Sequence, residues 1–279
     1  MEGTRQSASG NPEDLHFAFL ARRGISLRTG AEILDFGCGA ADAVERLCTR
    51  GRSCYGVDVN PFWQRSWVGR EAISGRVSLL DPGDYRLPFP DRFFDFCFSD
   101  QVFEHILDYS TVFRELGRVL KPDALSLHRF PGPNCPVEAH AMLPLPWLCR
   151  YKTYLAGAAL LGWRAADQQA LSWQQTLAEN RRRMSETFYP TKRALRRLAA
   201  RAGVAVEFVE REEFRSLTIG RLAALRNGFE RLGVGALAGA VLPLFAQRYM
   251  LLRPNLGRPR PPDQSCPEPA WHSPHRNCA

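Results

Sequence analysis

The sequence lacks the paired cysteines of a zinc motif or a disulfide framework. Its eight cysteines are scattered over 279 residues, and no two of them form a C-x-x-C pair. This spacing excludes the common cysteine-rich zinc sites and defines no set of disulfides. Several cysteines fall in apolar segments, where a free thiol behaves as a small hydrophobic side chain. We therefore expect free thiols and a reducing, cytoplasmic location.

The sequence also lacks an uninterrupted apolar run of the length that a membrane span needs, about twenty residues. The segment 232–246 carries no charge, but it is short and contains Pro243. An insertion at about 132–186, rich in proline and aromatic residues, is interrupted by Arg150 and Lys152. We expect a buried helix in the first segment and a helical lid in the second, with peripheral docking on a membrane as the alternative. The N-terminal residues have no apolar core and are not expected to form a secretory signal.

The charge balance is basic without being extreme. The chain has 37 Lys and Arg against 29 Asp and Glu, a net charge of +8, with basic runs at 181–183 and 192–201. Such runs most often form solvated helix faces, and a nucleic acid or an acidic lipid surface is the alternative partner. A hydrophobic content of 45% lets the chain bury one substantial core. One α/β domain with a modest insertion is therefore expected.

What the sequence does contain is the segment ILDFGCGAADAVERL, residues 33–47, whose pattern predicts a strand, a glycine turn and a helix. Gly37 and Gly39 permit a tight turn and leave the backbone open to a ligand. A dinucleotide-binding turn would have a third glycine three residues after Gly39, but Asp42 stands there, where its charge would face a pyrophosphate. The pattern therefore argues against a dinucleotide.

A second acidic residue follows at the position that a sugar ligand requires. Asp58 lies near the end of the half-apolar run SCYGVDVN, 19 positions after Gly39. A carboxylate about twenty residues beyond the glycine turn can accept hydrogen bonds from both hydroxyls of a ribose. The two motifs together indicate a ligand that contains a nucleoside but no pyrophosphate.

These residues resemble the class I methyltransferases that use S-adenosyl-L-methionine. LDFGCG is similar to the first motif of that family, and GVDVN is similar to the second. The segments 87–108 and 112–131 resemble its fourth and fifth strands with the helix between them. The resemblance covers about residues 30–131 and continues more faintly to about residue 254. It implies an S-adenosylmethionine-dependent methyltransferase.

The alternation of strands and helices predicts an α/β fold, a Rossmann-like seven-stranded mostly parallel sheet with helices on both faces. We expect a methyltransferase domain at 13–254, which includes the helical lid, between a disordered segment at 1–12 and a disordered Pro-rich tail at 255–279. The third helix is expected to end at Pro122. The expected strands lie at 32–36, 53–58, 76–80, 93–99, 124–129, 204–210 and 247–253, and the expected helices at 40–50, 61–73, 109–120 and 191–202.

The resemblance places the cofactor at the carboxyl ends of the strands. Asp58 would bind the ribose diol and Asp35 would lie near the amino group. The glycine turn, formed by Gly37, Cys38 and Gly39, would lie along the methionine and ribose.

The adenine end of the cofactor is less closely specified. The resemblance implies a carboxylate after the third strand that meets the adenine amino group, and Asp81 and Asp84 are both candidates for it. At the end of the fourth strand, the pocket would be completed by Ser99, Asp100 and Gln101.

A sulfonium methyl group is already electrophilic, so that the enzyme has mainly to position a nucleophile and exclude water. No metal is expected. A histidine that titrates near neutrality suits removal of a proton from a hydroxyl or amine. His128 at the end of the fifth strand and His140 at the start of the insertion are the candidates for a general base or substrate anchor. His105 is equally well explained as a packed structural residue.

The acceptor is expected to be a small or amphipathic molecule. Nucleic-acid amino-methyltransferases of this fold tend to carry Asn/Asp-Pro-Pro-aromatic after the fourth strand, and the sequence SDQVF lacks those prolines. The apolar insertion favours a pocket for a sugar, a lipid-linked glycan or a metabolite that is methylated on oxygen or nitrogen. A nucleic-acid methyltransferase and a non-catalytic membrane or protein interaction module are the alternatives.

Overall fold

The computed structural model describes residues 11–254 apart from 133, 139, 217–220, 233, 234 and 236–246. The predicted tail at 255–279, most of the predicted helix at 232–246 and most of the predicted disordered N-terminus lie outside these residues. The first described helix, α1 (Pro12–Arg22), begins at the edge of that predicted N-terminal segment.

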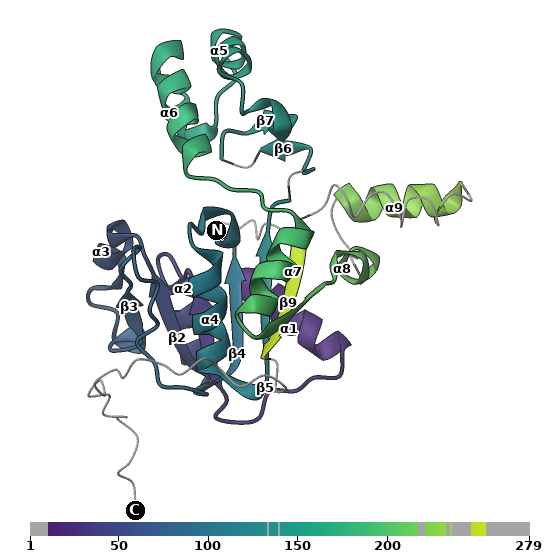
Figure 1. The fold of residues 1–279 in the computed structure, drawn as a ribbon. Coiled ribbons are helices and arrows are strands. Elements are labelled where there is room, and N and C mark those ends of the chain that lie inside the picture. The colour runs from purple at the N-terminus through teal and green to yellow at the C-terminus, as the bar shows by residue number, and fades with distance from the viewer. Residues whose placement is uncertain are drawn as a thin grey trace, which may run out of the picture.

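The centre of the fold is a seven-stranded sheet with the order β3-β2-β1-β4-β5-β9-β8 (Figure 1). The pairs among the first five strands are parallel, while β9 runs antiparallel to both of its neighbours. The mostly parallel sheet predicted from the sequence is thus confirmed. The strands are β1 (Glu32–Phe36), β2 (Ser53–Asp58), β3 (Val77–Leu79), β4 (Phe94–Asp100), β5 (Leu120–Phe130), β8 (Val204–Phe208) and β9 (Arg248–Pro254).

Helices cover both faces of the sheet. Successive residues of a strand point to opposite sides, so neighbouring residues of one strand pack against different helices. On β1, Leu34 packs in the cluster that contains the buried residues of α4 (Tyr109–Val119) and α7 (Lys192–Arg201). Its neighbour Ile33 packs in a second cluster with α1 and α2 (Asp42–Thr49). Figure 1 shows α4 and α7 in front of the sheet. The sheet is therefore buried on both sides, which is typical of parallel sheets.

One predicted helix differs from the structure, and so does the segment after another. The helix expected at 61–73 is interrupted: a 3-10 turn (Pro61–Trp63) leads into α3 (Gln64–Trp67), and a second 3-10 turn (Glu71–Ile73) follows Gly69, whose φ is +76°. The helix expected at 109–120 is observed within one residue as α4, which ends at Val119, but β5 begins at the next residue and not at 124 as expected. Pro122 therefore lies inside the strand, where the pairing of β4 with β5 shifts register.

The insertion forms a small helical unit with its own core. It contains β6 (Val137–Glu138), β7 (Leu143–Pro144), α5 (Lys152–Leu160) and α6 (Trp173–Ser185). Figure 1 shows it standing beyond the end of β5, on the side where the parallel strands end. Its helical character agrees with the expectation, and its closure over a site remains a prediction.

The C-terminal part of the described chain adds α8 (Glu210–Ser216) and α9 (Arg221–Arg231) between β8 and β9. Among the described residues, no helix is long and apolar enough to cross a membrane.

Candidate functional site

The glycine turn lies between β1 and α2, as predicted. The backbone amides of Gly37 and Cys38 both donate to the carbonyl of Val57, at 2.8 and 2.9 Å. Gly37 has a φ of +82°, and a Cβ built on it would overlap the side-chain methyl groups of Val102. This position therefore requires glycine both for its backbone conformation and for its close neighbour.

Asp58 ties the end of β2 to the glycine turn. Its Oδ2 accepts a hydrogen bond of 2.8 Å from the backbone amide of Gly39, and its Oδ1 accepts one of 2.8 Å from the amide of Asn60. The indole of Trp67 donates to the carbonyl of Gly39. Each carboxylate oxygen can accept a further hydrogen bond, so Asp58 is held in place and can still bind two hydroxyls.

Asp35 lies on β1, the strand that pairs with β2, and is 5% exposed. Burial raises the pKa of its carboxyl from 3.8 to about 8, and the nearby charges of Glu13, Asp100 and Asp58 add to the effect. Removing a charge from water is costly when no opposite charge compensates for it. A cationic ligand beside Asp35 would supply that compensation.

The end of β4 is brought next to these residues, but its side chains already have partners. Asp100 forms a two-pronged ion pair with Arg129, with bonds of 2.5 and 2.6 Å. Gln101 has a φ of +57° and donates from Nε2 to Gln247. Ser99 is fully buried. Of the three residues expected to complete the pocket, Ser99 therefore faces the interior of the protein.

Both candidates for the adenine contact lie in the exposed turn after β3. Oδ1 of Asp81 accepts a hydrogen bond from the amide of Gly83, which shapes the turn. The amide of Leu80 donates to the carbonyl of Asp58, so the turn starts beside the end of β2. Asp81 and Asp84 thus both remain predictions for adenine binding.

His128 does not face the acceptor side. Its side chain is fully buried, with Nδ1 bonded to Oγ of Ser99 at 2.8 Å and Nε2 bonded to Oγ of Ser126 at 2.6 Å. Burial holds its pKa well below the usual 6.5. The expectation that it faces the substrate is wrong, because the ring is enclosed by the protein: its centroid lies 4.3 Å from that of Phe103, and both ring nitrogens already have serine partners.

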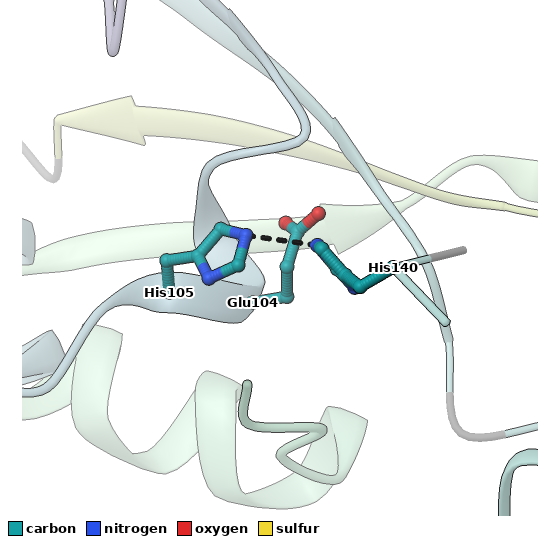
Figure 2. Close-up of side chains that lie close together, drawn as sticks. All are labelled: Glu104, His105 and His140. Atoms are coloured by element: carbon teal, nitrogen blue, oxygen red, sulfur yellow. Dashed lines mark hydrogen bonds between the residues drawn. The ribbon is translucent and has the colours of Figure 1, made fainter. Parts of the chain in front are cut away.

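His140 lies beside Glu104 and His105, two residues that are adjacent to each other in the sequence (Figure 2). Its Nε2 is 3.0 Å from Nε2 of His105, and its Nδ1 is 2.7 Å from Oε1 of Glu138. The hydrogen bond with Glu138 raises the pKa of His140. Glu104 completes the group: it is fully buried, and burial raises its pKa to about 7.

Sequence reasoning missed Glu104 and Glu138 as members of this group. The available signal was FEH, in which an acid and a histidine follow the fourth strand side by side, where ligands bind in parallel sheets. The contact between His105 and His140, which are 35 residues apart, depends on the path of the insertion and has no local sequence pattern.

Comparison with known proteins identifies what the central region is similar to. Residues 34–127 match the family described as "Methyltransferase domain". A demethylmenaquinone methyltransferase of Geobacillus stearothermophilus is 30% identical over 113 residues, which are 38% of this chain and 47% of that protein. A sterol 24-C-methyltransferase of Gibberella zeae is 25% identical over 114 residues, 39% of this chain and 30% of that protein. The chain thus matches less than half the length of either relative.

Solved structures give a weaker likeness over more of the chain. An S-adenosylmethionine-dependent methyltransferase from Mesorhizobium loti has a TM-score of 0.49 and 14% identity, covering 86% of this chain and 97% of that one. A Haemonchus contortus phosphoethanolamine N-methyltransferase in complex with phosphomonomethylethanolamine and S-adenosylhomocysteine has a TM-score of 0.47 and 18% identity, covering 87% and 53%.

Proposed function

We propose that the chain, whose residues 34–127 match the family described as "Methyltransferase domain", transfers the methyl group of S-adenosylmethionine to a small or amphipathic acceptor. The observation that carries the proposal is the Asp58 carboxylate, which is bonded to the glycine turn at 2.8 Å and whose oxygens can each accept a further hydrogen bond from a ribose diol.

The cofactor fits the charges at the ends of β1 and β2. When bound, it supplies an electrophilic methyl group on a sulfonium. The backbone at residues 37–39 would lie against its methionine and ribose, and Asp58 would bind the two ribose hydroxyls. Asp35, which is buried near other carboxylates, would bind the ammonium group and become ionised by doing so.

The acceptor is a lipid-like or otherwise amphipathic molecule with a nucleophilic oxygen or nitrogen. Two relatives are named for demethylmenaquinone and sterol acceptors, and the second name specifies a carbon as the methylated atom. The insertion beyond the strand ends also carries large apolar side chains on its surface. Among these are Trp147, Tyr151, Trp163 and Trp173.

The protein's task in this transfer is to orient the acceptor in line with the methyl group and to exclude water. The cofactor would supply the methyl group and leave as S-adenosylhomocysteine, and the proton of the acceptor oxygen or nitrogen would pass to a base or to solvent. Of the two histidines predicted to serve as base or anchor, His140 is only partly buried and remains our candidate for a substrate anchor on the acceptor side.

Calorimetric titration with S-adenosylmethionine and S-adenosylhomocysteine tests the cofactor site. We expect saturable binding of one equivalent of each by the wild-type chain, and a loss of at least about tenfold in affinity in Asp58→Asn, a change of about 1.4 kcal/mol. Asp123→Asn is the matched control, because Asp123 is exposed near the opposite end of a strand. A folded wild-type protein that binds neither compound would overturn the proposal.

Transfer of a radiolabelled methyl group tests the acceptor class. The labelled cofactor is incubated with the protein and either a lipid extract or an aqueous metabolite extract. We expect label that partitions into organic solvent and resists nuclease. Label that nuclease releases would favour the nucleic-acid alternative, and the absence of transfer to any extract by a protein that binds the cofactor would favour a non-catalytic module.

A further inference from the structure

Glu104, His105 and His140 converge from two separate parts of the chain. Glu104 and His105 belong to a 3-10 turn (Phe103–His105) directly after β4, while His140 lies in the insertion after β5. Figure 2 shows the two rings and the carboxylate directed toward one another. One ligand atom from each residue lies within 4.8 Å of the others, the one such group of three among the residues that the structure describes.

The outer hydrogen bonds of the two rings fix their tautomers. Nδ1 of His105 is 3.0 Å from the backbone carbonyl of Glu186, and a carbonyl can only accept. Nδ1 of His140 is 2.7 Å from Oε1 of Glu138. That carboxylate also accepts hydrogen bonds from the hydroxyl of Tyr189 and the amide of Ala141. Each ring therefore donates its Nδ1 proton outward.

Because both Nδ1 atoms donate outward, the two Nε2 atoms face each other and share one position for a proton or a cation. These Nε2 atoms are 3.0 Å apart, a distance at which two acceptors repel unless a proton or a cation lies between them. The same space faces Glu104, whose two carboxylate oxygens are buried and have no hydrogen-bond partner. Buried polar atoms of native proteins are normally paired, so this group as it stands lacks a positive partner.

We propose that Glu104, His105 and His140 bind one divalent transition-metal ion. Two imidazole nitrogens that each lie about 2.0–2.1 Å from one ion can be 3.0 Å apart when they subtend roughly a right angle at the ion. Glu104 offers the third ligand atom, a carboxylate oxygen within 4.8 Å of the ring nitrogens. This assignment departs from the sequence-based expectation of no metal, which rested on the needs of methyl transfer alone.

The ligand types specify the class of ion. Imidazole nitrogen with one carboxylate suits Zn²⁺, Mn²⁺, Fe²⁺ or Co²⁺, whereas Mg²⁺ and Ca²⁺ prefer oxygen ligands throughout. Three protein ligands leave at least one coordination position open, which is the arrangement of catalytic rather than structural zinc sites.

The surroundings already hold the ligands in place. Glu138 fixes the ring of His140 as an outer carboxylate, a common arrangement around metal-bound histidines. Arg183 donates to the backbone carbonyl of His140 and anchors the segment that carries the ring. The ring and the backbone of His140 are therefore held in place before an ion binds.

Metal binding by the full chain tests the proposal without any measurement of turnover. The protein is dialysed against a chelator and titrated with Zn²⁺ by calorimetry and with Co²⁺ by visible absorption, which reports nitrogen ligation. We expect one equivalent to bind to the wild-type chain. His105→Ala, a surface change, should weaken binding by at least about tenfold, and Glu138→Gln by about 10- to 100-fold.

The matched control is the double variant His272→Ala/His275→Ala, which removes the two histidines near the C-terminus. It should retain the site at full affinity. Glu104→Gln keeps the size of the buried side chain and is compared by circular dichroism with the wild type. Absence of stoichiometric Zn²⁺ and Co²⁺ binding by the wild-type chain would overturn the proposal, and so would binding that survives His105→Ala and Glu104→Gln but is lost in the C-terminal variant.

Discussion

Burial has opposite consequences for the two kinds of ionisable residue near the strand ends. It favours the protonated, neutral form of Asp35, whose pKa rises to about 8, and the unprotonated, neutral form of His128, whose pKa falls well below 6.5. His128 already bonds Ser99 and Ser126 through both ring nitrogens. It is therefore a packing residue of β5, whereas Asp35 is a carboxyl that a cation can ionise.

We predict that Asp35→Asn stabilises the free protein at pH 7 while weakening cofactor binding. The folded-state pKa of about 8 lies above the unfolded value of 3.8, so the wild type loses stability as pH rises from about 4 to about 8. The advantage of the variant should grow over this window and reach at least about 1.4 kcal/mol at pH 7, the equivalent of one pKa unit. Urea unfolding at a series of pH values measures it.

The same variant should change the protons released on binding. Below pH 8 the wild-type Asp35 must lose its proton to meet the ammonium group of the cofactor, so calorimetry in buffers of different ionisation enthalpy should detect proton release near pH 7. The variant should release fewer protons. Equal proton release and equal affinity in both proteins would show that Asp35 does not contact the cation.

The turn between β1 and α2 combines two constraints, and these can be separated by mutation. Gly37→Ala should abolish cofactor binding and destabilise the protein by more than the 1–2 kcal/mol or so that a left-handed alanine costs, because its Cβ also overlaps Val102. Gly51→Ala is the matched control: its φ is +76° and nothing lies within 4 Å of a Cβ there. Thermal unfolding and calorimetric titration measure both effects.

Removal of the neighbour tests the steric part of this argument. Val102→Ala in the Gly37→Ala background takes away the two methyl groups that the new Cβ would overlap. We expect the double variant to recover part of the lost stability. If Gly37→Ala costs no more than Gly51→Ala, the close approach of Val102 has no energetic importance.

The sequence predicts the elements of the sheet well because each has a local cause. β1 and β2 have the bounds expected from their apolar runs, and the acidic residue and glycines follow them at the expected places. The break near Gly69 was missed because one glycine in a helical pattern is often tolerated. The partners of Ser99 and His140 could not be predicted, since both depend on contacts between distant segments.

The whole molecule contains cores of different size. The two clusters that flank the sheet draw on strands and helices from most of the chain. The insertion has a third cluster of five buried residues, Ala141, Leu143, Cys149, Leu155 and Ala158. Stability follows the apolar surface that each unit buries, so the insertion should open at lower free energy than the sheet. A unit that opens easily beyond the strand ends is suited to admit and enclose an acceptor.

Hydrogen–deuterium exchange of the full chain tests this hierarchy and the role of the insertion as a lid. In the free protein, amides of α5 and α6 should exchange faster than those of β1 and β4, because fewer buried contacts hold them. S-adenosylhomocysteine should slow exchange at the glycine turn and at the end of β2 and leave α5 unchanged. Addition of an amphipathic acceptor, or of vesicles that present one, should then slow exchange in α5 and α6.

Uniform protection of the insertion and the sheet in the free protein would contradict the separate core. Protection of the insertion by the cofactor alone would show that the lid closes on the cofactor and does not wait for the acceptor.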